Sequence, residues 1–410
     1  LFYLLKIKKW YHLCTYKNKG EDFMSKISRR TFTGLMTAST AALAMPSISL
    51  GALPRVVVIG GGAGGATAAR YLAKDSKGAV DVTLIEASKR YYTCFFSNLY
   101  LGGVRNYGSI GHNYYGLAVN RGVNVVHEWA VSVDNAAKKV NLGSGASVSY
   151  DKLVISPGID IKYESVNGYS PEAQTHIPHA WKSGTQVQLL RNKVMNMKQG
   201  GTFVMVTPPN PYRCPPGPYE RVSMIAHQFK KSNPTAKIVV LDPKNKFSKQ
   251  GLFMQAWQRH YPGMIEWIDA DTHGGIKNVN VAKMEFETDL DTFKADAASI
   301  VPAQRAGSIA MAAGVNDGDW CPIIPASMQS KADENIYVLG DASVAASMPK
   351  SGFSANSQAK VAANHIRGSL TGSKIFGARY ANTCWSLVGT NDGIKVGASY
   401  KAGDEKIEAT

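Results

Sequence analysis

Cysteine is scarce in this sequence, with five residues in 410. None of the five lies in a Cys-x-x-Cys-His motif, so the chain is not expected to attach a c-type haem itself. No apolar run reaches the ~20 residues that a membrane-spanning helix needs, and no internal repeat or low-complexity tract is present. We therefore expect no transmembrane segment. With 44% hydrophobic residues, the chain can bury a full core.

Acidic residues are outnumbered, with 30 Asp and Glu against 46 Lys and Arg, which gives a net charge of +16. Residues 1–50 supply part of this excess. Lysine and arginine do not form a stripe with interleaved aromatic residues, so a nucleic-acid partner is not expected. A basic protein can instead steer an anionic substrate or an acidic protein partner, an attraction that salt weakens.

Residues 56–69 predict a short buried strand, a glycine turn and the start of a helix. The turn carries the glycines of a G-x-G-x-x-G pattern, which are Gly60, Gly62 and Gly65, with Gly64 between them. Such a turn lets the backbone approach a pyrophosphate, which then faces the N-terminus of the helix. A second strand ends on Glu86, 21 residues after Gly65, where a carboxylate can bind an adenosine ribose. The sequence therefore predicts a dinucleotide site.

Two later positions extend this prediction towards a flavin. Residues 335–339 predict a strand that ends in Gly340-Asp341, and in FAD reductase folds such an aspartate meets the ribityl chain and the pyrophosphate. Cys94 follows the Glu86 strand, where an isoalloxazine ring could reach it. The alternative for Cys94 is a small buried hydrophobic residue.

A second unit begins with a strand at residues 200–207 but has no glycine turn after it. Residues 208–220 are rich in proline instead. Because proline has no N–H to donate to a phosphate, this unit is not expected to bind NAD(P)H, although its fold can resemble a dinucleotide domain.

Without Cys14, which lies in the leader described below, four cysteines remain: Cys94, Cys214, Cys321 and Cys384. Four cysteines allow three sets of disulfide pairs. Cys214 lies in the proline-rich loop next to Arg213, whose charge should favour a thiolate. This position suits redox chemistry better than packing.

The motifs around these cysteines resemble those of the flavoprotein subunit of flavocytochrome c sulfide dehydrogenase. The resemblance extends from about Arg55 to the C-terminal region, with its most specific motif around Cys214. Its segments are Tyr91–Cys94, Arg213–Arg221, Pro302–Gly307, Pro349–Gly352 and Asn382–Cys384.

The resemblance implies FAD bound covalently through Cys94 and a redox disulfide between Cys214 and Cys384. The pairing of Cys214 with Cys321 stays open. The resemblance implies sulfide as the substrate, which attacks the disulfide and leaves a persulfide and a thiolate. It also implies a heterodimer with a c-type cytochrome subunit that carries the haem. Lys350 is expected to stabilise negative charge on the reduced flavin, with a solvated loop lysine as the alternative. Glu220 could relay protons or simply be an acid at the start of a helix.

The implied fold is α/β and similar to glutathione reductase, with two Rossmann-like three-layer domains and a short C-terminal α+β segment. The expected boundaries are a leader at residues 1–52, an FAD-binding domain at 53–160 and 293–378, a second dinucleotide-like domain without an NAD site at 161–292, and a segment at the flavin and partner interface at 379–410.

The leader contains Arg29-Arg30 before Thr31-Phe32, followed by a mildly apolar stretch at residues 34–44. This pattern predicts twin-arginine export, which carries folded proteins, and hence a periplasmic location. Met24 is the expected start, so residues 1–23 are interpreted as upstream sequence.

Three other functions remain open. A sulfide:quinone oxidoreductase uses similar cysteines but docks on a membrane, and the polar residues 403–410 are a poor anchor for it. An NAD(P)H-dependent disulfide or persulfide reductase needs the second glycine turn. A flavoprotein accessory to a thiosulfate-oxidising complex cannot be distinguished from the enzyme by sequence.

Overall fold

The computed structural model describes residues 52–182 and 184–410, and residues from Ala52 onward form one compact unit. Of the predicted leader, residues 1–51, with Met24, the twin-arginine motif and Cys14, lie outside the described residues.

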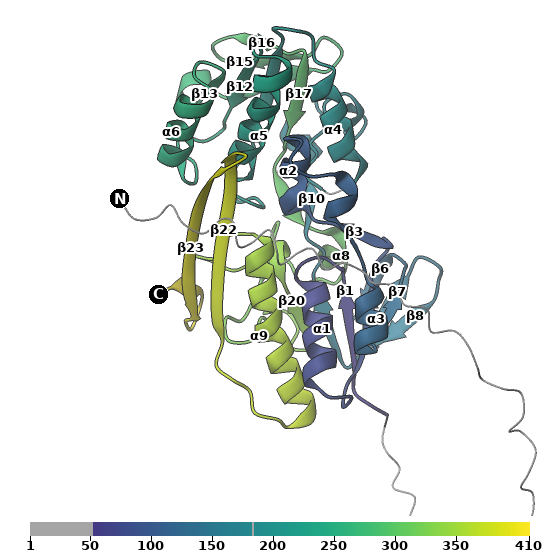
Figure 1. Cartoon of the computed structure of the whole chain (residues 1–410). Helices are drawn as coiled ribbons and strands as arrows, with labels where there is room; N and C mark the ends of the chain where they lie inside the picture. Colours follow the sequence, from purple (N-terminus) through teal and green to yellow (C-terminus); the bar gives the residue numbers. More distant parts are fainter. Residues whose placement is uncertain (1–51, 183) are drawn as a thin grey trace, which may run out of the picture. The chain divides into compact units, whose positions relative to one another are not determined.

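A five-stranded parallel sheet begins the fold, in the order β20-β9-β1-β2-β5 (Figure 1). Its strands are β1 (Arg55–Ile59), β2 (Asp81–Ile85), β5 (Asn124–Val126), β9 (Lys152–Ile155) and β20 (Ile336–Val338). Runs of buried Val, Ile and Leu form these strands because both faces of a parallel sheet are covered. Helices α1 (Gly65–Asp75) and α9 (Gly352–Thr371) pack against each other beside this sheet (Figure 1). Small buried residues such as Ala68 and Ala362 permit their close approach.

The remaining elements of this half are short. They are α3 (Tyr115–Arg121), α8 (Ser308–Ala312), an antiparallel meander of β6 (Ala130–Asp134), β7 (Lys139–Leu142) and β8 (Ser147–Ser149), and the pairs β3 (Arg90–Tyr92) with β4 (Gly111–Asn113) and β19 (Cys321–Pro322) with β21 (Ser343–Val344).

The second half repeats the parallel architecture with four strands in the order β13-β12-β11-β17. These strands are β11 (Thr202–Val206), β12 (Lys237–Leu241), β13 (Ile265–Ile268) and β17 (Ala297–Ile300). Its helices are α2 (Ser97–Leu101), α4 (Thr185–Met195), α5 (Gly217–Ser232), α6 (Gln250–His260) and α7 (Ala270–His273), and α2 packs on α5. A separate antiparallel sheet consists of β14 (Ile276–Asn280), β15 (Glu285–Thr288) and β16 (Thr292–Lys294).

The predicted return to the first domain at residue 293 is too early. β17 pairs with β11 along its whole length, from Ala297 to Ile300, so these residues complete the second sheet. The chain then returns through β18 (Gln304–Ala306), which pairs with β10 (Ile159–Ile161) in the two-stranded ribbon between the halves.

A long hairpin crosses both halves at the C-terminus (Figure 1). It consists of β22 (Arg379–Gly389) and β23 (Asp392–Ala402), joined at its edge by β24 (Ile407–Ala409). β22 contacts α9 from the first half and α5 and α6 from the second. Residues 379–410, expected to mix helix and strand, form strands alone. The hairpin brings Leu387 of β22 to the first turn of α5, where its N–H donates to Glu220.

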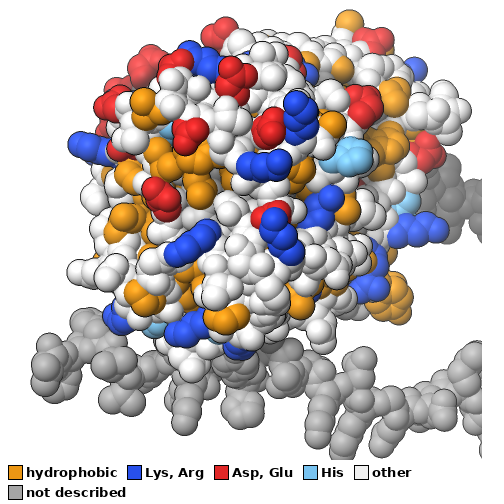
Figure 2. Space-filling view, turned by 90° about the horizontal axis from the view of Figure 1, so that it is seen from above, with side chains coloured by type: hydrophobic (Ala, Val, Ile, Leu, Met, Phe, Trp, Pro, Cys, Tyr) orange, Lys and Arg blue, Asp and Glu red, His pale blue; other side chains and the backbone are white. Residues whose placement is uncertain are grey.

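The surface at the end formed by the second half mixes acidic, basic and apolar side chains (Figure 2). Among residues 52–182 and 184–410, no helix is both long and apolar enough to cross a membrane.

Candidate functional site

The predicted glycine turn joins β1 to α1 with geometry that only glycine satisfies at two positions. Gly60 has φ +94°, and a Cβ on it would lie 2.3 Å from the carbonyl oxygen of Ser156. A Cβ on Gly65 would lie 1.8 Å from the Gly60 carbonyl oxygen. Both distances are far below van der Waals contact, so the tight turn and the start of α1 depend on these glycines. The N-terminus of α1 is thereby placed at the carboxyl end of the sheet, where a pyrophosphate binds in such folds.

Glu86 and the other turn glycines lie at the same edge. The Glu86 carboxylate accepts hydrogen bonds from the backbone N–H of Gly61 at 2.7 Å and of Ser88 at 2.9 Å. A Cβ on Gly64 would come within 2.5 Å of the Ser156 hydroxyl, whereas one on Gly62 would only touch the Tyr91 ring at 3.7 Å. The carboxylate is thus fixed beside the turn, a position that fits binding of ribose hydroxyls.

Gly340 and Asp341 follow β20 and reach the same region. Gly340 has φ +72° and donates its N–H to the side chain of Gln358 at 2.8 Å. Asp341 is largely buried, with Oδ2 3.9 Å from Nη1 of Arg213. Burial raises the pKa of Asp341, and the charges of Arg213 and Lys350 oppose this shift.

Several buried polar atoms here have no hydrogen-bond partner, among them Oδ1 of Asp341, Nη2 of Arg213 and Nε2 of Gln304. Unpaired buried groups are costly, so they are expected to bind something polar. The ribityl hydroxyls and polar ring edge of a flavin could satisfy them, and the residues present therefore fit FAD.

Cys94 lies in a one-turn 3₁₀ helix (Cys94–Phe96) and is half-buried. Its sulfur is 3.9 Å from the Tyr91 hydroxyl. Burial alone would lower the pKa of the Arg213 guanidinium, but the charges of Cys94 and Asp341, together with smaller contributions, raise it. The predicted attachment cysteine and the predicted ribityl aspartate are therefore neighbours of one buried arginine, which sequence analysis had considered only as a neighbour of Cys214.

Cys214 lies in the loop before α5 with φ +60°, a left-handed conformation that is strained for a cysteine. Its backbone N–H donates to the Lys350 carbonyl at 2.7 Å. The expectation that Arg213 makes Cys214 a thiolate is not met. Burial and the charges of Glu220, Cys384 and Cys94 raise the thiol pKa well above its usual range, and Arg213 only opposes this.

Cys384 is buried in β22 and reaches the same group of charges from the C-terminal hairpin. The Asn382 amide donates to its sulfur at 3.3 Å. Cys321 is different: it is fully buried in the core of the first half, and burial raises its pKa to about 12. Within residues 52–410, the four cysteines are free thiols in this structure.

Lys350 is not a solvated loop lysine. Its ammonium donates to the carbonyls of Asp341 at 2.7 Å and Ser343 at 2.9 Å and lies 3.7 Å from the centre of the Trp320 ring. Burial lowers its pKa to about 8.

Glu220 is more than an acid at a helix start. Its carboxylate is buried in the first turn of α5, where it accepts hydrogen bonds from the Leu387 N–H of β22 at 2.8 Å and from the Asn98 amide of α2 at 2.9 Å. Burial raises its pKa to about 7. Its only sequence signal was its distance of six residues from Cys214.

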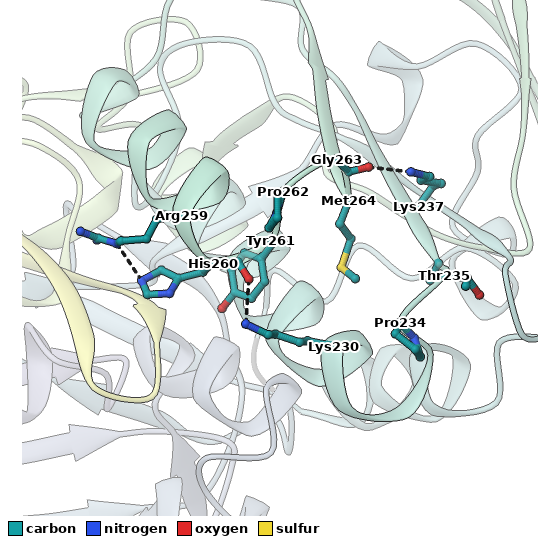
Figure 3. Close-up of a pocket in the computed structure, with 11 residues that line it drawn as sticks. Lys230, Pro234, Thr235, Lys237, Arg259, His260, Tyr261, Pro262, Gly263 and Met264 are labelled. Carbon is teal, nitrogen blue, oxygen red and sulfur yellow. Dashed lines mark hydrogen bonds between the residues drawn. The ribbon is translucent and has the colours of Figure 1, made fainter.

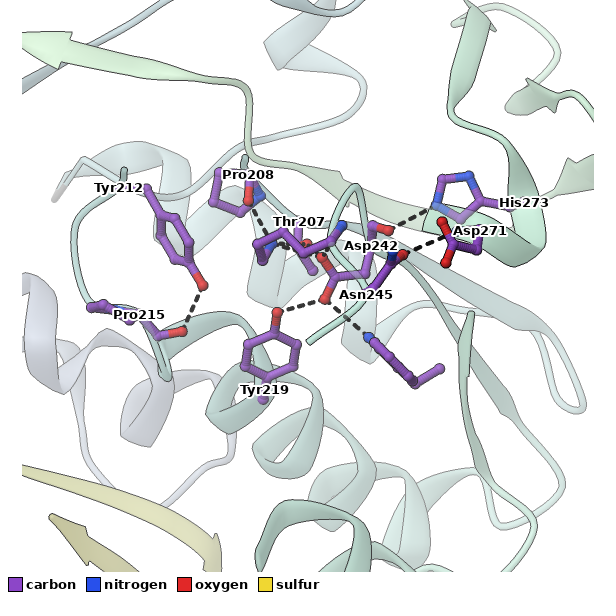
Figure 4. A network of polar contacts seen from close by, with 11 residues as sticks. Thr207, Pro208, Tyr212, Pro215, Tyr219, Asp242, Asn245, Asp271 and His273 are labelled. Carbon is purple, nitrogen blue, oxygen red and sulfur yellow. Dashed lines mark hydrogen bonds and ion pairs between the residues drawn. The ribbon is translucent and has the colours of Figure 1, made fainter. Parts of the chain in front are cut away.

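A network of polar contacts lies at the carboxyl ends of β11 and β12, the edge of the second sheet where a dinucleotide binds in such folds (Figure 4). Asp242 follows β12 and is fully buried. Its side chain accepts hydrogen bonds from Tyr219 at 2.5 Å, Thr207 at 2.8 Å and Trp267 at 2.9 Å, and its Oδ1 lies 2.6 Å from the Lys244 ammonium. The carboxylate at this position is therefore fully used within the protein.

A pocket of about 360 Å³ lies away from the predicted site residues, between the ends of α5 and α6 (Figure 3). Lys230 and Lys237 line it, but their ammonium groups donate to the carbonyls of His260 and Gly263. These two lysines therefore bind the C-terminal end of α6 and the loop that follows it.

In comparisons with known proteins, three parts of the chain each match a different protein family. Residues 187–302 match the family described as sulfide dehydrogenase [flavocytochrome c] flavoprotein chain, central, and residues 377–410 match flavocytochrome c sulphide dehydrogenase, flavin-binding. Residues 54–197 match pyridine nucleotide-disulphide oxidoreductase.

Among solved structures, the sulfide:quinone oxidoreductase of Aquifex aeolicus is similar in fold, with a TM-score of 0.67, 18% identity and coverage of 87% of this chain and 86% of that one. A ferredoxin reductase from Rhodopseudomonas palustris gives a TM-score of 0.67 at 16% identity, covering 87% of this chain and 90% of that one. These likenesses confirm the predicted α/β fold with two dinucleotide-type domains.

Two curated relatives add sequence similarity. The mouse mitochondrial sulfide:quinone oxidoreductase is 25% identical over 186 residues, which are 45% of this chain and only 41% of the mouse protein. The flavoprotein chain of sulfide dehydrogenase [flavocytochrome c] from Chlorobaculum thiosulfatiphilum is 52% identical over 44 residues, which are 11% of this chain and 90% of that sequence. Since this identity and both specific family segments agree with the resemblance of the cysteine motifs, the chain is an oxidoreductase that belongs to the flavoprotein family of flavocytochrome c sulfide dehydrogenase.

Proposed function

We propose that this protein oxidises hydrosulfide to sulfur or polysulfide through a redox disulfide of Cys214 and Cys384 and transfers the electrons to a c-type cytochrome subunit. The observation that supports this most is that Cys384 and Cys94, from distant parts of the chain, both lie close enough to Cys214 to raise the pKa of its thiol. Cys321 lies instead in the core of the first half, where Lys350 is the one charge that shifts its pKa.

The chemistry begins with thiol–disulfide exchange. Hydrosulfide attacks one sulfur of the disulfide, so that a new S–S bond forms, the old one breaks and the other cysteine leaves as a thiolate. FAD, when bound, supplies an acceptor that takes two electrons together and releases them singly. Arg213 and Asp341 would hold its polar groups. Lys350 would place positive charge beside it, although its ammonium is already bound by two carbonyls.

FAD is proposed to be covalently bound through Cys94. Cys94→Ser should therefore bind flavin that is released on acid denaturation, whereas the wild-type polypeptide should stay yellow. A Cys321→Ser variant serves as the control and should keep its flavin, because Cys321 lies in the core of the first half. Flavin that is released from the acid-denatured wild type would contradict this assignment.

Glu220 is proposed to accept protons near the cysteine pair. With a pKa of about 7, it is increasingly ionised, and able to act as a base, as the pH rises from about 6 to about 8. The rate of sulfide-driven reduction should rise over this range, and Glu220→Gln should lose that rise and fall by about tenfold or more. Because hydrosulfide also titrates in this range, the difference between the two profiles is the measurement.

Glu266→Gln provides a matched control for this test, because Glu266 is exposed on β13. Its profile should equal that of the wild type. A Glu220→Gln profile parallel to that of the wild type would exclude proton transfer through Glu220.

The partner and location are proposed with the function. A c-type cytochrome would carry the haem, and export by the twin-arginine route would place both in the periplasm. The rival sulfide:quinone oxidoreductase would pass electrons to a membrane quinone instead, and its support is similarity in fold and 25% sequence identity over 186 residues. A role as accessory to a thiosulfate-oxidising complex would be favoured by neighbouring sulfur-oxidation genes, whereas an adjacent cytochrome gene favours the proposed enzyme.

The function is tested by adding sulfide anaerobically to the purified complex and following flavin and haem absorption. Sulfide should reduce the flavin and then the haem. NADH and NADPH, added separately, should leave the flavin oxidised, since Asp242 and Lys244 occupy the edge where a nicotinamide dinucleotide would bind. Reduction by either nucleotide with none by sulfide would overturn the proposal in favour of a nucleotide-dependent reductase.

A further inference from the structure

Lys249 is a half-buried lysine beside the cysteine pair that the proposed function does not yet use. It lies immediately before α6 with φ +64°. Its ammonium donates to the backbone carbonyl of Cys384 at 3.3 Å and to the Ser386 hydroxyl at 3.1 Å. A residue of the second half therefore holds the part of β22 that carries Cys384.

The surroundings place this cation among the reacting groups. Burial lowers the pKa of Lys249, and the negative charges of Cys384, Glu220 and Cys214 oppose that effect, with Cys384 the largest of the three. Glu220 holds the same strand through the Leu387 N–H. The other cations near this site are Lys350, bound by the Asp341 and Ser343 carbonyls, and Arg213 and Arg221, which are close to Cys214. The Tyr400 hydroxyl also faces Cys384.

The two cysteines differ in ways that favour one direction of attack. Cys214 lies in the loop before α5, whereas Cys384 lies in β22, where the Asn382 amide donates to its sulfur at 3.3 Å. Glu220 is the largest charge that disfavours a Cys214 thiolate. In thiol–disulfide exchange, the thiol that is more stable as an anion leaves faster, and a hydrogen bond donated to the sulfur stabilises the anion.

We propose that Lys249 is a positioning residue that makes Cys384 the leaving thiolate, so that hydrosulfide adds to Cys214. This inference rests on the proposed function and assigns the order of its first step. The HS⁻ sulfur bonds to Sγ of Cys214, the Cys214–Cys384 bond breaks, and its electron pair stays on Cys384. One negative charge enters and one remains on Cys384, the residue whose backbone carbonyl binds the Lys249 ammonium, and no other oxidant or reductant is consumed.

The test compares Lys249→Met and Lys249→Arg with Lys246→Met, which removes an exposed lysine from the same loop. Reduction of the flavin by sulfide is followed by stopped flow across pH. Lys249→Met should slow it about tenfold, with its rise displaced by about one unit to higher pH, as expected when an opposite charge next to a thiolate is lost. Lys249→Arg should keep most of the rate, and Lys246→Met all of it. A purely structural role would change thermal stability without moving the pH profile.

The position of the added sulfur is measured independently in the wild type. The protein is mixed with less than one equivalent of sulfide, quenched with iodoacetamide before the flavin absorption falls, and digested for mass spectrometry. The extra sulfur should be on the Cys214 peptide, with Cys384 directly alkylated. Extra sulfur on Cys384, or an unchanged pH profile in Lys249→Met, would overturn the inference. The mass-spectrometric result is obtained on the wild type, so it decides the question even if Lys249→Met does not fold. Failure of sulfide to reduce the wild type would instead overturn the proposed function, and this inference with it.

Discussion

Cys214→Ser and Cys384→Ser are each expected to abolish sulfide-driven flavin reduction, with a loss on the order of a thousandfold or more. Either change removes the disulfide, and hydrosulfide then has no S–S bond to attack. Both variants should fold and keep their covalent flavin, because Cys94 is retained. Stopped-flow absorbance after addition of sulfide gives the rate, and acid denaturation reports the bound flavin.

Cys321→Ser is the matched control for both. Its thiol is fully buried in the first core, and its pKa of about 12 makes it unreactive near neutral pH. The rate should change by less than about threefold, with some loss of stability from the buried hydroxyl. Full turnover in Cys384→Ser together with loss in Cys321→Ser would require the pair to be Cys214 and Cys321.

Gly65→Ala is expected to prevent FAD binding almost completely. The new Cβ would lie 1.8 Å from the Gly60 carbonyl oxygen and 3.2 Å from a methyl group of Val58. The turn cannot accommodate it without moving the start of α1, where the pyrophosphate is expected. The flavin content of purified protein, read from its absorption relative to the protein band, should fall at least tenfold by this argument.

Gly108→Ala separates this local effect from a general loss of glycine. A Cβ on Gly108 meets no atom within 4 Å, and its φ is not in the left-handed range. This variant should retain a full complement of flavin. Equal flavin content in Gly65→Ala and the wild type would contradict the placement of the cofactor at this turn.

The first dinucleotide half could be predicted from sequence because its signals are local. The Gly60–Gly65 turn and the strand ending at Glu86 lie within about 30 residues, as a βαβ unit requires. The structure confirms the α/β fold and places Glu86 against the Gly61 N–H. The cysteine motifs also sufficed to identify the family.

Contacts between residues far apart in the chain could not be predicted from the sequence. The burial of Glu220 results from contacts with Asn98 and Leu387, more than 100 residues away on either side. The same is true of Arg213 with Asp341 and of Lys249 with Cys384. Desolvation and neighbouring charges, which set the pKa of Cys214, depend on these contacts and not on the adjacent Arg213 alone.

The boundary at residue 293 was wrong for a similar reason. Residues 297–300 are a short apolar segment that could return to either sheet, and only pairing with β11 decides between them. Such short strands carry too little pattern to reveal their partner.

The central claim, that Cys214 and Cys384 form the disulfide that sulfide reduces, is tested most directly by disulfide mapping of the isolated oxidised protein. Non-reducing digestion and mass spectrometry should yield one peptide pair joining Cys214 to Cys384, with Cys321 free. One equivalent of sulfide, quenched with iodoacetamide before the flavin is reduced, should replace that pair by one persulfide and one alkylated thiol. A Cys214–Cys321 pair, or a Cys214–Cys384 pair that stays intact in the sample quenched before flavin reduction, would contradict the account.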